Sequence, residues 1–204
     1  MSKMFKSNET INQENKDSKV KKIFKEVFFS FSCLAIILLI CDIITKVCAE
    51  KFLTGKGSVV VIPHLLNFTL TYNNGAAWGM GGDATWSRVI LALISWVVAI
   101  AIIVYVIMKY KKLNNYLRAT IMVILAGDVG NLIDRTFFYN RGVIDFLDIT
   151  PLIKGFGIFN FADSCLVVGI IMLLIYFLIE WINESKNEKK NKEIADKNGD
   201  DSKK

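Results

Sequence analysis

The sequence predicts an all-α membrane protein with four transmembrane helices and a small extracytoplasmic β element between the first two. Hydrophobic residues make up 53% of the 204 residues, a high share for a water-soluble domain. They gather in four runs, and one of these, Val89–Met108, contains 20 residues without a charge. About 20 apolar residues cross the hydrocarbon core as a helix, so the four runs predict four membrane spans.

The other three runs are shorter because a polar residue interrupts or borders each of them. These runs are Val27–Cys41, Ala119–Ile133 and Ser164–Ile179. Asp42 follows the first, Asp128 interrupts the second, and Asp163 precedes the third. No convincing small-residue cleavage site follows the first run, so we expect it to remain as an anchor and not to be removed as a signal peptide.

Basic residues flank alternate ends of the four runs and predict the orientation of the chain. They are Lys16, Lys19, Lys21, Lys22 and Lys25, then Lys109, Lys111, Lys112 and Arg118, and finally Lys186, Lys189, Lys190 and Lys192. Cytoplasmic loops carry the excess of lysine and arginine, so both termini are expected inside. This pattern accounts for the net charge of +6 without a nucleic-acid partner. Residues 1–22 and 183–204 are polar and predicted to be disordered tails around a membrane domain at 23–182.

The loop between the first two runs has strand patterns. Residues 58–63 read "SVVVIP", and residues 66–73 read "LNFTLTYN", in which apolar and polar residues alternate strictly. A period of two predicts a strand with one apolar face. A glycine-rich turn follows, so we expect a β element over about 56–80, lying on the outer membrane surface.

Several carboxylates are predicted at one depth near the outer edge of the membrane. Counted from the cytoplasmic ends of their helices, Asp42 and Asp134 lie 16 residues along and Asp163 lies 18 along. At the rise of an α-helix, these counts correspond to roughly 24 to 27 Å. Asp145 follows Asp134 in a short outer loop and must return near the same level. Charged groups within a membrane usually face a partner or a cavity.

Asp145 and Asp163 have no neighbouring cation in the sequence, and this distinguishes them from the other acids. Asn160 stands three residues before Asp163, on the same helical face. Two carboxylates held close together share a proton, because both cannot ionise cheaply. One can then take a proton from water while the other hydrogen-bonds a scissile carbonyl. We therefore predict Asp145 and Asp163 as a water-activating pair.

The remaining acids have possible structural roles. Asp42 and Lys46 are spaced to pair on one helical face, and a structural ion pair is the favoured interpretation. Asn131, Asp134 and Arg135 lie within about one turn. Arg135 can clamp a carboxylate, or it can form a boundary ion pair with Asp134. One histidine, His64, and four scattered cysteines make no metal site, and no cofactor is expected.

The motifs in this order resemble those of the lipoprotein signal peptidase family, also called signal peptidase II. The matching segments are "CDIITK", "TYNNGAAWG", "GNLIDR", "GVIDF" and "FNFADS". They contain Asp42, Lys46, Asn73, Gly75, Ala76, Ala77, Asn131, Asp134, Arg135, Asp145, Asn160, Ala162 and Asp163. Five motifs in order across roughly residues 30–180 make the resemblance specific.

The resemblance implies an endopeptidase that cleaves prolipoprotein signal peptides just before a diacylglyceryl-modified cysteine, in a bacterial inner membrane. It implies that Asp145 and Asp163 are catalytic, and that Asn73, Asn131, Arg135 and Asn160 line the substrate groove. A small residue, Ala162, leaves room for the lipidated cysteine region. Lipid-modified precursors and membrane lipids are the implied partners.

The chain departs from the family pattern at two places. The segment between Asp134 and Asp145 is about two residues longer than usual, and Asp128 occupies a position where a small apolar residue is usual. Two other functions could use the same acids. An ion- or proton-coupled transporter would place its acids near the midplane and show repeats or broken helices. A non-catalytic assembly factor would have no reason to present Asp145 and Asp163 without partners.

Overall fold

A computed structural model describes residues 31–75, 85–138 and 140–201 of the chain. Its four long helices are the first helix (Phe31–Leu53), α2 (Thr85–Lys109), α3 (Asn115–Phe137) and α4 (Phe161–Asp201). A short 3-10 helix, η2 (Tyr110–Lys112), follows α2. Each long helix contains an apolar segment of membrane-crossing length, which confirms the predicted fold class of a four-span helical membrane protein. The predicted tail at 1–22, together with Ala76 and Ala77, lies outside the described residues.

A three-stranded antiparallel sheet connects the helices at one end. Its strands are β1 (Ser58–Ile62), β2 (Leu66–Asn73) and β3 (Val143–Asp148), in the order β1-β2-β3. The first two strands confirm the predicted strand segments, whereas β3 was not predicted. It comes from the loop between α3 and α4, and its sequence "VIDFLD" lacks a clean alternation of apolar and polar residues.

The two faces of β2 have different roles. Phe68 and Leu70 pack against a buried cluster of four residues, Ala49, Leu53, Ile144 and Phe146. The rings of Phe68 and Phe146 meet edge to face, with centroids 6.1 Å apart. Asn73 projects from the polar face of the strand and reaches Asp145 on β3. The alternation in β2 therefore fixes the sheet to the end of the first helix and turns a polar face toward the acids.

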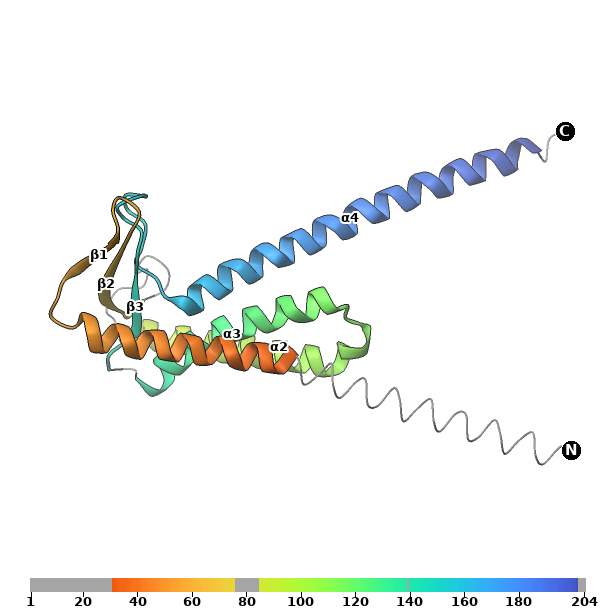
Figure 1. The fold of residues 1–204 in the computed structure, drawn as a ribbon. Helices are drawn as coiled ribbons and strands as arrows, with labels where there is room; N and C mark the ends of the chain where they lie inside the picture. Colours follow the sequence, from red (N-terminus) through yellow and green to blue (C-terminus); the bar gives the residue numbers. More distant parts are fainter. Residues whose placement is uncertain (1–30, 76–84, 139, 202–204) are drawn as a thin grey trace, which may run out of the picture.

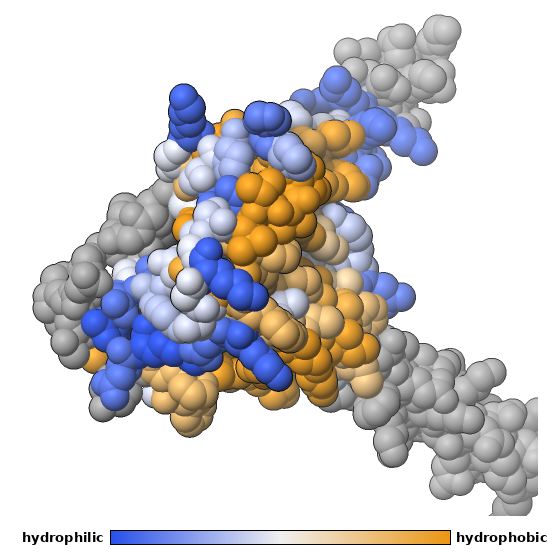
Figure 2. All heavy atoms as spheres, turned by 60° about the vertical axis from the view of Figure 1, so that its left-hand side comes forward, coloured by the Kyte–Doolittle hydropathy of each residue, from blue (hydrophilic) through white to orange (hydrophobic). Residues whose placement is uncertain are grey.

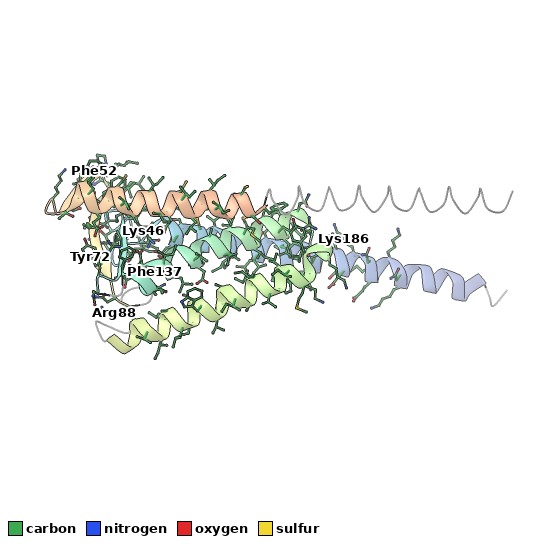
Figure 3. All side chains as sticks on the ribbon, turned by 90° about the horizontal axis from the view of Figure 1, so that it is seen from below. Lys46, Phe52, Tyr72, Arg88, Phe137 and Lys186 are labelled. Carbon is green, nitrogen blue, oxygen red and sulfur yellow. The ribbon has the colours of Figure 1, made fainter. Side chains whose placement is uncertain are left out.

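The helices extend from the sheet in one general direction (Figure 1). The first helix, α2 and α3 lie alongside one another, and α4 diverges from them toward its C-terminal end. The connection between α2 and α3 lies at the end remote from the sheet. Figure 3 places Phe52, Tyr72 and Arg88 at the sheet end and Lys186 at the other. The sheet therefore lies at one end of the bundle of four long helices.

Glycines allow α3 to approach α4 closely. A Cβ atom on Gly127 would lie 2.5 Å from the carbonyl oxygen of Ala162, and one on Gly169 would lie 2.5 Å from Ile124. Such distances are too short for any side chain, so both positions require glycine at this helix spacing. The start of α4 is thereby held directly against α3.

The outer surface of the bundle is apolar. Large hydrophobic side chains such as Val97, Ile107 and Leu174 are more than 60% exposed. Figure 2 shows hydrophobic residues along the helices and hydrophilic residues gathered toward the sheet end. An apolar surface of this extent is expected where helices contact lipid.

Helix α4 is longer than the sequence predicted. The structure continues it as a helix to Asp201, where we expected a disordered tail from residue 183. The segment after Trp181 is rich in lysine and glutamate, which are good helix formers, and Glu188 and Lys192 have helical i, i+4 spacing. A polar composition of this kind suits a solvated helix as well as a disordered tail.

Candidate active site

Asp145 lies near the start of β3 and is only 1% exposed. Asn73 of β2 donates a hydrogen bond from Nδ2 to Asp145 Oδ2 at 3.1 Å. Asn160, just before α4, donates from Nδ2 to Asp145 Oδ1 at 2.7 Å. The backbone amide of Gly75 donates to Asn73 Oδ1 at 2.9 Å and orients that amide group. Both oxygens of Asp145 therefore accept hydrogen bonds, and none of the described cations forms an ion pair with it.

Asp163 occupies the first turn of α4 and forms a capping box with Asn160. The backbone amide of Asp163 donates to Asn160 Oδ1 at 2.9 Å. In return, the backbone amide of Asn160 donates to Asp163 Oδ2 at 3.0 Å. This reciprocal pairing satisfies two amide groups that a helix start leaves free. The capping box explains why a carboxylate is stable in the first turn of an otherwise apolar helix.

Two asparagines connect the carboxylates. Asn131 of α3 donates from Nδ2 to Asp163 Oδ1 at 2.8 Å. Asn160 Nδ2 donates to Asn131 Oδ1 at 3.0 Å, in addition to its bond to Asp145. The chain Asp145–Asn160–Asn131–Asp163 therefore brings together strand β3 and helices α3 and α4. The predicted pair of acids shares one hydrogen-bonded site.

The environment of Asp145 favours its protonated form. Burial, and then the negative charge of Asp163, raise the pKa of Asp145 to about 7. Hydrogen bonds from Asn73 and Asn160 and the charge of Lys46 act in the opposite direction but are weaker. Near neutral pH the site can therefore hold a proton on one carboxyl group, as acid–base chemistry at a carbonyl requires.

The side chain of Lys46, on the first helix, reaches toward α3 (Figure 3) and is the centre of the polar network. Its Nζ atom forms ion pairs with Asp42 at 2.8 Å and with Asp134 at 2.9 Å. It also donates to Asn131 Oδ1 at 3.1 Å and to the carbonyl oxygen of Gly130 at 3.2 Å. The predicted Asp42–Lys46 pair is present, and Lys46 additionally orients the asparagine that holds Asp163.

Asp42 supports the start of α4. Its Oδ1 atom accepts a hydrogen bond from the backbone amide of Ala162 at 2.9 Å. Ala162 is 1% exposed, and its Cβ atom would lie 3.0 Å from a Cβ atom on Gly130. Three helices thus meet around small residues at this level. A carboxylate at a helix N-terminus is also favoured by the helix dipole.

Asp134 and Arg135 are adjacent in sequence but face different surroundings. Asp134 pairs with Lys46 and, at 3.3 Å, with Arg141. Arg135 lines a cavity together with Asp145 and Asp163. The printed ion pairs of Asp134 are with Lys46 and Arg141, and among the described residues none joins it to Arg135. A clamp by Arg135 on other carboxylates stays a prediction.

The cavity has a volume of about 590 Å³ and lies among α2, α3, α4 and the segment before α4. Its polar wall includes Asn73, Asn131, Arg135, Asp145 and Asp163. Its other walls are largely apolar, with Leu91 and Ile94 from α2 and Leu166 and Val167 from α4. A site of this kind can bind an apolar chain and bring a polar group on it to the carboxylates.

Sequence reasoning missed a chain of polar contacts that joins Tyr72, Glu50 and Arg141. Nη1 of Arg141 donates to both carboxylate oxygens of Glu50, Oε1 at 2.9 Å and Oε2 at 2.8 Å. The guanidinium of Arg141 also stacks on the ring of Phe138. Tyr72 donates to Glu50 Oε1 at 3.0 Å. Glu50 and Arg141 are 91 residues apart, so no local spacing could have indicated the pair. The contact connects the end of the first helix to the loop that leads into β3.

The fold and the site together define a bacterial-type membrane enzyme. Two solved structures described as bacterial membrane enzymes resemble the chain, each at 33% identity. The first has a TM-score of 0.65 and covers 76% of this chain and 90% of its own. The second has a TM-score of 0.61 and covers 73% of this chain and 92% of its own.

The chain belongs to the signal peptidase II family, and the model of that family matches residues 34–179. Lipoprotein signal peptidases from Staphylococcus aureus strains MRSA252 and JH9 are 36% identical over 153 residues. The match covers 74% of this chain and 90% of each relative. The predicted family is confirmed, and the chain is a multi-pass membrane peptidase of lipoprotein processing. The transporter alternative finds no support in these comparisons.

Proposed function

We propose that this chain is an intramembrane aspartic endopeptidase that removes signal peptides from prolipoproteins, just before the diacylglyceryl-modified cysteine. One observation carries the proposal. Asp145 and Asp163 are held in a single hydrogen-bonded site by Asn131 and Asn160, on the wall of a largely apolar cavity. This geometry supplies carboxyl groups to the reaction and an apolar space for a signal peptide.

The chemistry follows from one proton shared by two carboxyl groups. The protonated carboxyl donates a hydrogen bond to the scissile carbonyl oxygen, and the ionised one takes a proton from water. The water oxygen bonds to the carbonyl carbon and gives a tetrahedral intermediate. The carbon–nitrogen bond then breaks, and the carboxyl group that took the proton from water passes it to the departing amine of the lipidated cysteine. Asn131 and Asn160 keep the two carboxyl groups oriented throughout.

The test compares lipidated and unlipidated forms of one prolipoprotein precursor, incubated with the purified full chain. We expect cleavage of the lipidated precursor immediately before the modified cysteine, measured by mass spectrometry of both products. The unlipidated form should be cut far more slowly, because the acyl chains contribute most of the apolar contact area. Equal cleavage of both forms would contradict the proposed substrate class.

The same proposal places the active site near the outer leaflet, with both termini in the cytoplasm. Cysteines introduced at Lys56 and Lys112 should then react with a membrane-impermeant thiol reagent from opposite sides. The native cysteines must be replaced first, because Cys48 is exposed and would react as well. Labelling of both introduced positions from one side would contradict this orientation.

Cleavage should depend on pH through Asp145. Since the pKa of Asp145 is raised to about 7, the shared proton is lost as the pH rises above that value. We expect kcat/KM to fall by about tenfold per pH unit on the alkaline side. Asn73→Ala removes a hydrogen bond that favours the ionised form of Asp145, so it should raise the pKa of Asp145. The alkaline limb of the pH profile, where kcat/KM falls, should then move to higher pH.

The matched control is Thr69→Ala on the same strand, whose hydroxyl contacts Asp148 and not Asp145. This variant should leave the alkaline limb in place. The measurement is kcat/KM against pH for all three proteins, with folding checked by melting in detergent. A limb that does not move in Asn73→Ala would show that Asp145 does not control it.

Arg135 should be sensitive even to a conservative change. Its planar guanidinium can bind a carboxylate or carbonyl through two hydrogen bonds, which an ammonium group cannot reproduce. We expect Arg135→Lys to lower kcat/KM by about tenfold or more, the effect of losing a charge-assisted hydrogen bond. Arg118→Lys, on the same helix but outside the cavity, is the control and should cleave normally. Normal cleavage by Arg135→Lys would leave Arg135 as a boundary residue.

A further inference from the structure

Asp128 is a carboxylate on the cavity wall that the proposed reaction does not use. It lies on α3, seven residues before Arg135, so the two side chains share a helical face. Both line the same cavity. Across it, Ser95 of α2 also lines the cavity and forms a side-chain hydrogen bond with Asp128. Asp128 and Ser95 are therefore two further polar groups on the cavity wall.

Within the described part of the chain, one oxygen of this carboxylate lacks a hydrogen-bond partner. Asp128 is only 9% exposed, and among the described residues its buried Oδ2 atom accepts no hydrogen bond. Leaving a buried acceptor unsatisfied is costly, and each such group in a folded protein needs an explanation. The wall of the same cavity includes Leu91, Ile94 and Leu166, whose side chains offer no hydrogen bond. A donor that enters the cavity can therefore supply the missing partner.

We propose that Asp128 and Ser95 form a polar subsite that binds a hydroxyl or amide side chain in the apolar part of the signal peptide. The proposal rests on the peptidase function proposed above. A signal peptide cut at Asp145 and Asp163 extends into the membrane from the cut. Asp128 is about 10 Å deeper along α3 than Arg135, by the rise of a helix. A helical signal peptide would place its residue about seven positions before the cysteine at this level.

The subsite fits a neutral donor better than a cation. Arg135 already directs its positive charge at Asp128 and would oppose a second cation beside it. A lysine or arginine at this depth is also costly to insert into the membrane. Serine, threonine, asparagine and glutamine can donate to Oδ2 of Asp128 without either penalty. The subsite thus makes Asp128 a specificity-determining residue for the sequence of the precursor.

The test uses lipidated precursors that differ at one position in a leucine stretch. Serine is placed in turn at positions four to eight before the modified cysteine, and each precursor is compared with the all-leucine form. The unchanged protein should prefer serine at one of these positions by about five- to tenfold in kcat/KM, the effect of one hydrogen bond. Asp128→Ala should bring that ratio to about one, and Asp128→Asn, which still hydrogen-bonds, should retain most of it.

The control is Val97→Ala, a lipid-exposed change on α2 that should alter neither the ratio nor the rate. If the unchanged protein cleaves all precursors equally well, the subsite is refuted while the peptidase function stands. If Asp128→Ala and Asp128→Asn slow every precursor equally, Asp128 acts through Arg135 and the subsite is again refuted. Failure of the unchanged protein to cleave any lipidated precursor would overturn the proposed function itself.

Discussion

We expect Asp145→Asn and Asp163→Asn each to abolish cleavage, by a factor of at least about 10³, while the protein stays inserted and folded. Asparagine keeps the size of aspartate and can still accept hydrogen bonds, but it cannot take a proton from water. At position 163, asparagine can also continue to cap α4, because its side-chain oxygen can accept the hydrogen bond that the backbone amide of Asn160 donates to Asp163. Both oxygens of each aspartate accept hydrogen bonds, so asparagine leaves one donor without its oxygen acceptor at either site. Melting in detergent therefore separates a loss of chemistry from a loss of folding.

Asp148→Asn provides the matched control for this experiment. Asp148 is buried on the same strand as Asp145, but its contacts are Thr69 and Thr150, outside the cavity. This variant should cleave at nearly the normal rate. The measurements are precursor processing and thermal melting in detergent for each variant. Substantial cleavage by either well-folded dyad variant would refute the pair and make Asp134 or Asp128 the next candidate.

The double variant separates a catalytic unit from two independent contributions. Members of a unit that acts together are strongly non-additive, since removing one already removes the function. Asp145→Asn combined with Asp163→Asn should therefore be little slower than either single variant. Multiplication of the two separate losses would instead indicate that the carboxyl groups act independently.

Lys46→Met should destabilise the protein by about 3 to 5 kcal/mol, because it breaks a buried charge network. Lys46, Asp42 and Asp134 are each at most 4% exposed, so the remaining charges cannot reach water. Asp134 keeps Arg141 as a partner, whereas Asp42 keeps only the backbone amide of Ala162. Asp42 is therefore the group whose charge is left uncompensated.

This reasoning gives a second variant that tests the cause. Asp42→Asn removes the orphaned charge, so adding it to Lys46→Met should recover part of the lost stability, although Asp42→Asn alone destabilises. Lys51→Met is the control, since Lys51 is an exposed lysine on the same helix. Melting in detergent is the readout. Additive losses in the double variant would contradict the network.

Cleavage by Lys46→Met, measured on the folded fraction, should also fall. The ammonium group of Lys46 donates to Oδ1 of Asn131, and Nδ2 of Asn131 donates to Asp163. Without Lys46, this asparagine loses one of the contacts that fix its orientation. Lys46 is accordingly a positioning residue, and its effect should appear in kcat more than in KM.

The sequence by itself determined the spans and the strand β2, because both depend on patterns local to the chain. An uncharged run such as Val89–Met108 must be buried or face lipid, and strict alternation over residues 66–73 admits one secondary structure. The helical rise placed the acids near one depth. The motifs in turn indicated the family, which the comparisons confirm.

The tertiary structure alone decided which of these residues meet. Lys46 finds Asn131 across 85 positions of sequence, and Asp42 finds the amide of Ala162 across 120. Strand β3 forms because β2 offers it a partner, and this places Asp145 beside Asn73. Arg135 is turned to the cavity and Asp134 away from it by their places on α3. Contacts of this kind depend on how helices pack, and no local period in the sequence records that packing.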